Sequence, residues 1–150
     1  MNNNGALKIT AGALDAMARH FQKELPREGC GFLAGRNGVA HRFYPINNLN
    51  PDCRKFLMDP LHVMRTETSI LRRNQRILGI CHSHPDGECS PSNWDISGAF
   101  FDTDQKLPLW SDEVQVIALM VPPENPTVRG FRIHKGGQVD QVELDLEGAL

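Results

Sequence analysis

The chain has 150 residues, of which 40% are hydrophobic and 23% are charged, and its net charge is −2. This length fits one domain and the composition is that of ordinary globular proteins, which excludes a disordered chain, a collagen-like fibre and a disulfide-stapled miniprotein. The nearly neutral charge gives no support for a general nucleic-acid or membrane-surface binder. We therefore expect residues 1–150 to form a single domain with no nucleic-acid or membrane partner.

The cellular compartment is predicted from three features of the sequence. No apolar run approaches the roughly 18 to 20 residues that a membrane span needs. The first ten residues, MNNNGALKIT, lack the charged and apolar regions that are typical of a secretory signal. The four cysteines (Cys30, Cys53, Cys81 and Cys89) do not suggest a disulfide framework in a chain of this size. Together these features predict a soluble protein of the reducing cytoplasm.

Hydrophobic periodicity and turn signals predict alternating strands and helices. In chain order we expect a strand over 7–10, a helix ending at Leu25, strands over 31–35 and 39–46, a helix from Pro60, a strand over 77–82, a helix from Ser92 to about Phe101, and strands over 114–121, 127–134 and 138–144. Thr10 and Asp59 are suitable N-caps, and Asn37-Gly38 is a hairpin signal. This mixed order predicts an α/β or α+β sheet covered by helices.

The most informative stretch is His82-Ser83-His84-Pro85, followed after six residues by Ser92-Asn93-Trp94-Asp95. Residues two apart in a strand point to one face, so the imidazoles of His82 and His84 converge at the end of the expected strand. Asp95 falls in the first turn of the next helix, and the loop between them could return its carboxylate to the same point. Two histidines and one aspartate match a catalytic zinc, which takes three protein ligands and a water whose pKa it lowers to about 7.

Simpler interpretations of the same residues stay open at this stage. A His-x-His pair alone is a weak signal, because most such histidines lie on the surface or are hydrogen-bonded in a core. Ser92 and Asp95 also have the spacing of a helix capping box, which is compatible with a metal site because a cap would fix the direction of Asp95. Spacing alone does not exclude a structural zinc or another divalent metal.

The complete pattern His-Ser-His-Pro-x6-Ser-x-x-Asp resembles the signature of the JAMM (MPN+) metallopeptidases. Glu28-Gly29-Cys30-Gly31 resembles the segment that carries the catalytic glutamate of that family. The stretch PDCRKFLMDP over 51–60 and the last expected strands are similar to short bacterial members. The resemblance therefore covers nearly the whole chain, and it implies a JAMM/MPN fold, which is cytidine-deaminase-like, with a mixed, mostly antiparallel sheet flanked by about three helices.

The resemblance also implies a role for each residue of the motif. His82, His84 and Asp95 would bind one zinc ion per chain. Glu28 would hold the attacking water, take its proton and pass it to the leaving amine. Ser92 would donate a hydrogen bond to the carbonyl oxygen as it becomes an oxyanion.

Short bacterial members of this family are similar to enzymes that act on ubiquitin-like sulfur carriers ending in Gly-Gly, so we expect such a carrier as the partner. The alternatives are an isopeptidase on ubiquitin-like conjugates and, from another class, a non-catalytic MPN scaffold. A nucleobase deaminase is not supported, because its His/Cys-x-Glu and Cys-x-x-Cys patterns are absent from the sequence. Cys89 and the arginines Arg72, Arg73 and Arg76 have no role that the sequence assigns.

Overall fold

The computed structural model of the protein describes residues 7–100, 104–106, 109–110 and 112–148. Its elements are β1 (Leu7–Ile9), α1 (Ala11–Glu24), β2 (Cys30–Arg36), β3 (Val39–Ile46), α2 (Pro60–Arg72), β4 (Arg76–His84), α3 (Asn93–Gly98), β5 (Val114–Leu119), β6 (Thr127–Ile133), β7 (Val139–Val142) and β8 (Leu144–Leu146). Within the described ranges, no helix is both long and apolar enough to cross a membrane.

The first two helices begin where the sequence predicts, because polar side chains satisfy their free amide groups. The side chain of Thr10 accepts a hydrogen bond from the Ala13 amide at the start of α1. Asp59 accepts one from the Leu61 amide at the start of α2, whose first residue is Pro60. Between β2 and β3, Asn37 and Gly38 both have positive φ, as the tight hairpin requires.

The strands form one eight-stranded sheet in the order β7-β6-β5-β4-β2-β3-β1-β8. The pairs β2–β3, β2–β4, β5–β6 and β6–β7 are antiparallel, whereas β1–β3, β1–β8 and β4–β5 are parallel. The predicted mixed, mostly antiparallel sheet with three helices is therefore confirmed. β2 and β4 lie at its centre, and the loops that follow or precede them meet at one end of the sheet.

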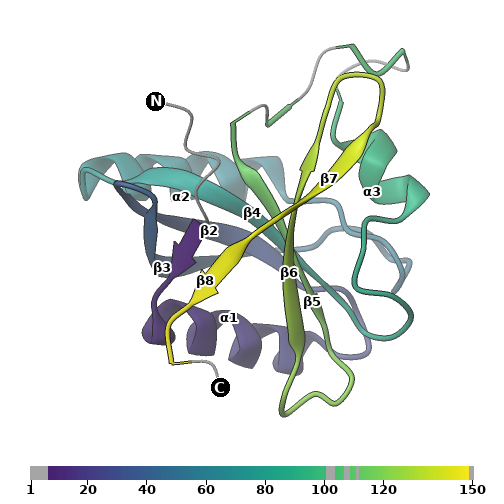
Figure 1. Cartoon of the computed structure of the whole chain (residues 1–150), viewed down its shortest axis with the longest axis horizontal. Helices are drawn as coiled ribbons and strands as arrows, with labels where there is room; N and C mark the ends of the chain where they lie inside the picture. Colours follow the sequence, from purple (N-terminus) through teal and green to yellow (C-terminus); the bar gives the residue numbers. More distant parts are fainter. Residues whose placement is uncertain (1–6, 101–103, 107–108, 111, 149–150) are drawn as a thin grey trace.

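Apolar side chains cover both faces of the central strands, which explains why β2 is a nearly continuous apolar run. On one face Leu33 packs with Met17 and Phe21 of α1. On the other face Phe32 packs in the same cluster as Ile70 of α2. Helices α1 and α2 thus lie on opposite sides of the sheet, with α3 at the end of the sheet beyond β4 (Figure 1).

The single strand predicted over 138–144 is wrong, because the structure divides this segment into β7 and β8. β7 pairs with β6, but after Glu143 the chain crosses to the opposite edge of the sheet and β8 pairs with β1. Figure 1 shows this segment passing in front of the sheet. Burial accounts for this path: Val142 and Leu144 both pack against the core cluster that contains residues of α1 and of β1.

Two further details differ from the sequence-based expectation. Helix α3 ends at Gly98, earlier than predicted, and Phe101 lies outside the described residues. In α2 the apolar residues with a helical period (Leu61, Met64 and Leu71) are exposed, whereas Thr66 and Ile70 are buried. The inner face of α2 is therefore defined by contact with β3 and β4, and its periodic apolar residues Leu61, Met64 and Leu71 face outward.

Two glycines provide a matched stability test. At Gly35, in the irregular pairing between β2 and β3, an added Cβ would lie 1.8 Å from the Val39 carbonyl oxygen, whereas at Gly12 in α1 it would meet nothing within 4 Å. We expect Gly35→Ala to lower the free energy of unfolding by about 1 to 3 kcal/mol, and Gly12→Ala to raise it by roughly 0.5 to 1 kcal/mol. Urea unfolding measures both changes, and equal effects would contradict the described packing of β2.

Candidate metal centre

The candidate site is assembled by the antiparallel pairing of β2 with β4. Cys30 lies opposite His82 in this register, which places Glu28, two residues before Cys30, beside the end of β4. Two hydrogen bonds fix the approach: the Ser83 amide donates to the Gly29 carbonyl at 3.0 Å, and the Gly29 amide donates to the Ser83 hydroxyl at 2.8 Å. The loop residue Glu28 is therefore held by the sheet itself.

The two histidines converge as strand alternation predicts. The Nε2 atoms of His82 and His84 lie 3.1 Å apart, and both side chains are almost fully buried. His84 Nδ1 lies 2.7 Å from the Glu88 carbonyl oxygen, so in the neutral imidazole Nδ1 carries the donated proton. His84 Nε2 then keeps its lone pair, as a metal ligand requires, and lies 3.1 Å from both His82 Nε2 and Asp95 Oδ2.

Helix α3 delivers the carboxylate of Asp95 to the same point. Ser92 is its N-cap, and a complete capping box links the two residues. The Asp95 amide donates to the Ser92 hydroxyl at 3.1 Å, and the Ser92 amide donates to Asp95 Oδ2 at 2.9 Å. The same Oδ2 atom lies 3.1 Å from the Nε2 atoms of both His82 and His84. The expected cap and the expected convergence therefore occur together.

The pKa values of the two carboxyl groups of the site are shifted in opposite directions. Burial raises the pKa of Glu28 to about 7, and the nearby negative charge of Asp95 adds to this shift. For Asp95, burial acts in the upward direction, but hydrogen bonds to His82 and His84 outweigh it and lower the pKa below its usual value. Burial alone would lower the pKa of His84, yet its hydrogen bonds to Asp95 and to the Glu88 carbonyl raise it. Glu28 is therefore suited to exchange a proton near neutral pH, whereas Asp95 stays ionised.

The four side chains fit a divalent metal. One ligand atom from each of Glu28, His82, His84 and Asp95 lies within 4.8 Å of the others, and all four groups are buried. Ligands sharing a zinc ion at about 2.0 to 2.2 Å lie roughly 3.3 to 3.6 Å apart, close to the 3.1 Å separations of the two histidines and Asp95. Within the described part of the chain, Glu28 Oε1 is buried without a hydrogen-bond partner. This donor set, two nitrogens and carboxylate oxygen, is one that zinc accepts.

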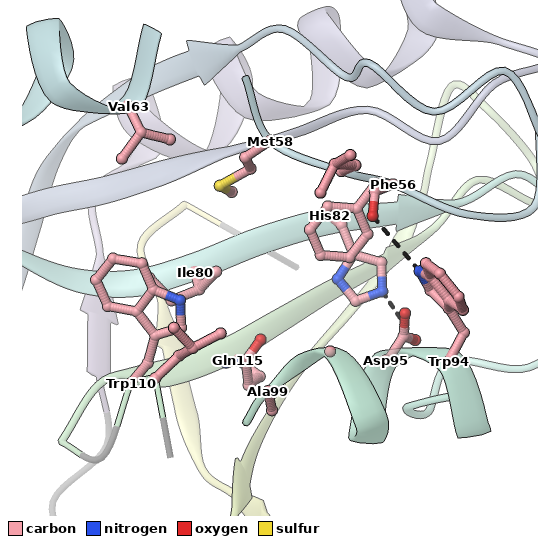
Figure 2. A pocket seen from close by; sticks show the side chains of 13 residues that line it. Phe56, Met58, Val63, Ile80, His82, Trp94, Asp95, Ala99, Trp110 and Gln115 are labelled. Carbon is pink, nitrogen blue, oxygen red and sulfur yellow. Dashed lines mark hydrogen bonds and ion pairs between the residues drawn. The ribbon is translucent and has the colours of Figure 1, made fainter. Parts of the chain in front are cut away.

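Two cavities flank this cluster. The first, of about 260 Å³, is mostly apolar; it is lined by Phe56, Leu57, Met58, Val63, Ile80, His82, Trp94, Asp95, Gly98, Ala99, Leu109, Trp110 and Gln115. Figure 2 shows His82, Asp95 and Trp94 at one end of this cavity and Trp110 at the other. The second, of about 410 Å³, is lined mainly by residues with polar or charged side chains, among them Glu28, His84 and Ser92, and is called the polar cavity below. The cluster therefore separates an apolar cavity from a polar one.

Some residues support the site through contacts that the sequence does not reveal. The Phe56 ring stacks on His82 at 4.5 Å between centroids, and its carbonyl accepts a hydrogen bond from Trp94 Nε1 at 3.5 Å. Ser83 stands inside the motif, but its contact with Gly29 depends on the pairing of β2 with β4, which spacing does not reveal. The Trp94 side chain is 43% exposed and joins α3 to the loop before α2 through its hydrogen bond to the Phe56 carbonyl.

All four cysteines are free, and no disulfide is formed. Cys81 is fully buried in the cluster with α1. Cys30 and Cys89 are buried as well, whereas Cys53 is exposed. Burial raises the pKa of the Cys81 thiol and, to about 12, that of Cys30. These two thiols are therefore unreactive core residues.

Comparisons with known proteins identify relatives of this chain by sequence and by structure. Residues 10–134 match the family described as prokaryotic homologues of the JAB domain. A probable TtuB-protein conjugate cleaving protease of Thermus thermophilus is 32% identical over 77% of this chain and 82% of its own length. A CysO-cysteine peptidase of Mycobacterium tuberculosis is 26% identical over 90% and 88%. The solution structure of a Desulfitobacterium hafniense protein has a TM-score of 0.78 and 32% identity, covering 95% of this chain and 94% of that one.

The chain belongs to the family of prokaryotic JAB-domain proteins, and its fold is that of the JAMM/MPN proteins. It is a short bacterial-type JAMM peptidase, as the sequence motif implies.

Metal content tests the candidate centre directly. We expect His82→Ala, His84→Ala and Asp95→Ala each to reduce bound zinc from the expected one ion per chain to well below that, because each would remove one of the three expected ligands. Glu28→Gln should keep the metal, because Glu28 is assigned to the water. Elemental analysis after growth in zinc-replete medium measures the four variants. A metal-free wild-type protein would contradict the assignment, and loss of zinc from Glu28→Gln would make Glu28 a ligand.

Proposed function

We propose that this protein is a zinc-dependent peptidase that hydrolyses the amide bond after the C-terminal Gly-Gly of a ubiquitin-like sulfur-carrier protein. The observation that carries the proposal is the buried convergence of Glu28 with His82, His84 and Asp95 at the boundary between two cavities. The names of two relatives, which refer to TtuB conjugates and to CysO-cysteine, support a carrier protein as the substrate.

In this proposal the two histidines and Asp95 hold the zinc ion. Zinc in a site of this kind polarises a carbonyl group and makes water acidic enough to ionise near neutral pH. Phe56 and the Glu88 carbonyl hold the imidazoles of His82 and His84 in their orientations. The capping box holds Asp95. The protein's contribution is a fixed arrangement of donor atoms that needs no reorganisation when the substrate arrives.

Glu28 transfers the proton in the proposed reaction. Its carboxylate takes a proton from the attacking water, whose oxygen forms a bond to the carbonyl carbon. The carbon–nitrogen bond then breaks, and Glu28 gives the same proton to the leaving amine. A pKa raised to about 7 by burial suits both halves of this exchange, because the group gives up and accepts a proton with similar ease at neutral pH.

Ser92 stabilises the negative charge on the carbonyl oxygen. In the capping box its hydroxyl oxygen accepts from the Asp95 amide, so its hydroxyl hydrogen is available to donate to a substrate. Ser92 also lines the polar cavity beside Glu28 and His84. One side chain therefore serves both the helix start and the proposed oxyanion.

The Thermus relative, named as a conjugate cleaving protease, favours a second candidate function. An isopeptidase would cut the amide bond between a carrier's terminal glycine and a lysine side chain of another protein. The chemistry at Glu28 and Ser92 would be the same, and the two functions differ in the leaving group.

Substitutions at Ser92 separate its two roles. Ser92→Ala should lower the free energy of unfolding by about 0.5 to 2 kcal/mol, and it should reduce kcat by roughly 10²- to 10³-fold. Ser92→Asp should recover the stability, because aspartate caps helices well, without recovering kcat, because an ionised carboxylate cannot donate. Urea unfolding and single-turnover rates measure the two effects. A stable and fully active Ser92→Asp variant would leave capping as the one role of Ser92.

A carrier protein with one residue after its Gly-Gly tests the proposed substrate. Replacing the glycine next to the scissile bond by valine should reduce kcat/KM about 10²-fold or more, because a side chain there displaces the tail and about 1 Å of displacement can cost that much. A free peptide with the same tail should be a poor substrate, because it lacks contacts with the folded carrier. Mass spectrometry follows the three reactions, with Glu28→Gln as the inactive control. Equal cleavage of all three would indicate a general peptidase.

A further inference from the structure

The two cavities can be assigned to opposite sides of the scissile bond, a step that rests on the proposed function. Glu28 must reach the nitrogen of the leaving amine, and Glu28 lines the polar cavity and not the apolar one. A leaving group within reach of Glu28 would therefore occupy the polar cavity. The carrier's tail would then approach the cluster from the apolar cavity, whose lining includes Phe56 and Trp94.

Among the described residues that line the polar cavity, the exposed Arg54 is the one lysine or arginine, and three acidic residues (Glu28, Asp86 and Glu88) share the lining with it. The neighbouring cation, Lys55, lies 3.8 Å from the carboxylate of Asp52 and 4.5 Å from the centre of the Trp94 ring. In the described part of the chain, the Arg54 guanidinium makes no ion pair or hydrogen bond. It is therefore free to bind an anionic group that enters the cavity.

The backbone of Arg54 is held in place by a series of side chains that repeats every second residue. Asn48 accepts from the Asn50 amide, Asn50 from the Asp52 amide and Asp52 from the Arg54 amide, each at 2.9 Å. Asn48 also donates to the Glu28 carbonyl at 2.8 Å. The position of Arg54 is therefore tied to that of Glu28 through a short hydrogen-bonded path.

We propose that Arg54 binds the carboxylate of the leaving residue, so that the polar cavity is a subsite for an amino acid or short extension with a free carboxyl end. Such a product is a zwitterion. Its new ammonium group suits Glu28, Asp86 and Glu88, and its carboxylate suits the planar guanidinium of Arg54, which can bind it through two hydrogen bonds. The lysine of an isopeptide conjugate would bring a cation but no carboxylate next to the bond. Arg54 therefore favours removal of C-terminal residues over cleavage of protein conjugates.

The test compares two carrier substrates that differ at one group. Both bear a single residue after Gly-Gly, ending in a free carboxylate in one substrate and in a carboxamide in the other. Wild-type protein should cleave the carboxylate substrate about tenfold faster, measured as kcat/KM, as a hydrogen-bonded charge pair would produce. The Arg54→Gln variant should cleave both substrates with the kcat/KM that the wild-type protein has for the carboxamide substrate. Arg65→Gln, which changes an exposed arginine of α2 that lines neither cavity, should retain the wild-type preference.

Each outcome decides one question. Loss of the preference in Arg54→Gln together with unchanged cleavage of the carboxamide supports the subsite, because a merely structural defect would slow both substrates. Equal cleavage of the two substrates by wild-type protein, or a preference that persists in Arg54→Gln, overturns the subsite and leaves the peptidase assignment standing. Failure of the wild-type protein to cleave either carrier overturns the proposed function as well.

Discussion

The register between β2 and β4 determines whether this protein has a site at all. With Cys30 opposite His82, the amide and carbonyl of Gly29 bond to Ser83, and Glu28 comes to the end of the strand that carries both histidines. A slip of one residue would turn His82 and His84 to the opposite face of the sheet. The apolar side chains on the two faces of β2 oppose such a slip, because one face packs in a cluster with α1 and the other in a cluster with α2. Core packing and site geometry therefore depend on the same strand pair.

The second constraint is the shared use of one carboxylate oxygen. Asp95 Oδ2 accepts from the Ser92 amide and also lies 3.1 Å from both imidazole nitrogens. A helix of six residues is too short to be stable by itself, so its capping box and its contacts with β4 must hold it in place. The loop before α2 adds to this support, since Phe56 contacts both His82 and Trp94. The start of α3 and the candidate centre therefore share the same carboxylate.

The sequence predicts local features well and long-range ones poorly. The caps at Thr10 and Asp59, the hairpin at Asn37 and the alternation of His82 and His84 all depend on neighbours a few residues away, so a pattern reveals them. The division of the last strand and the exposed apolar face of α2 depend on which edges and faces are already covered, which no local pattern contains. The burial of Glu28 is also a long-range feature, because it arises from the pairing of β2 with β4. The residues next to Glu28 in the sequence would equally suit an ordinary carboxylate in an exposed loop.

The crossing of the chain from β7 to β8 has a consequence for the dynamics of the protein. β8 is three residues long and closes the edge of β1, a strand far from it in the sequence, so this seam is joined by a ladder of only three residue pairs. Local opening begins where such contacts are sparse, and the central strands open last. Amide hydrogen exchange should accordingly be fast at the seam and slow in β2 and β4. The candidate centre lies at the end of the β2–β4 pair, so opening of this seam would leave the reactive groups in their places.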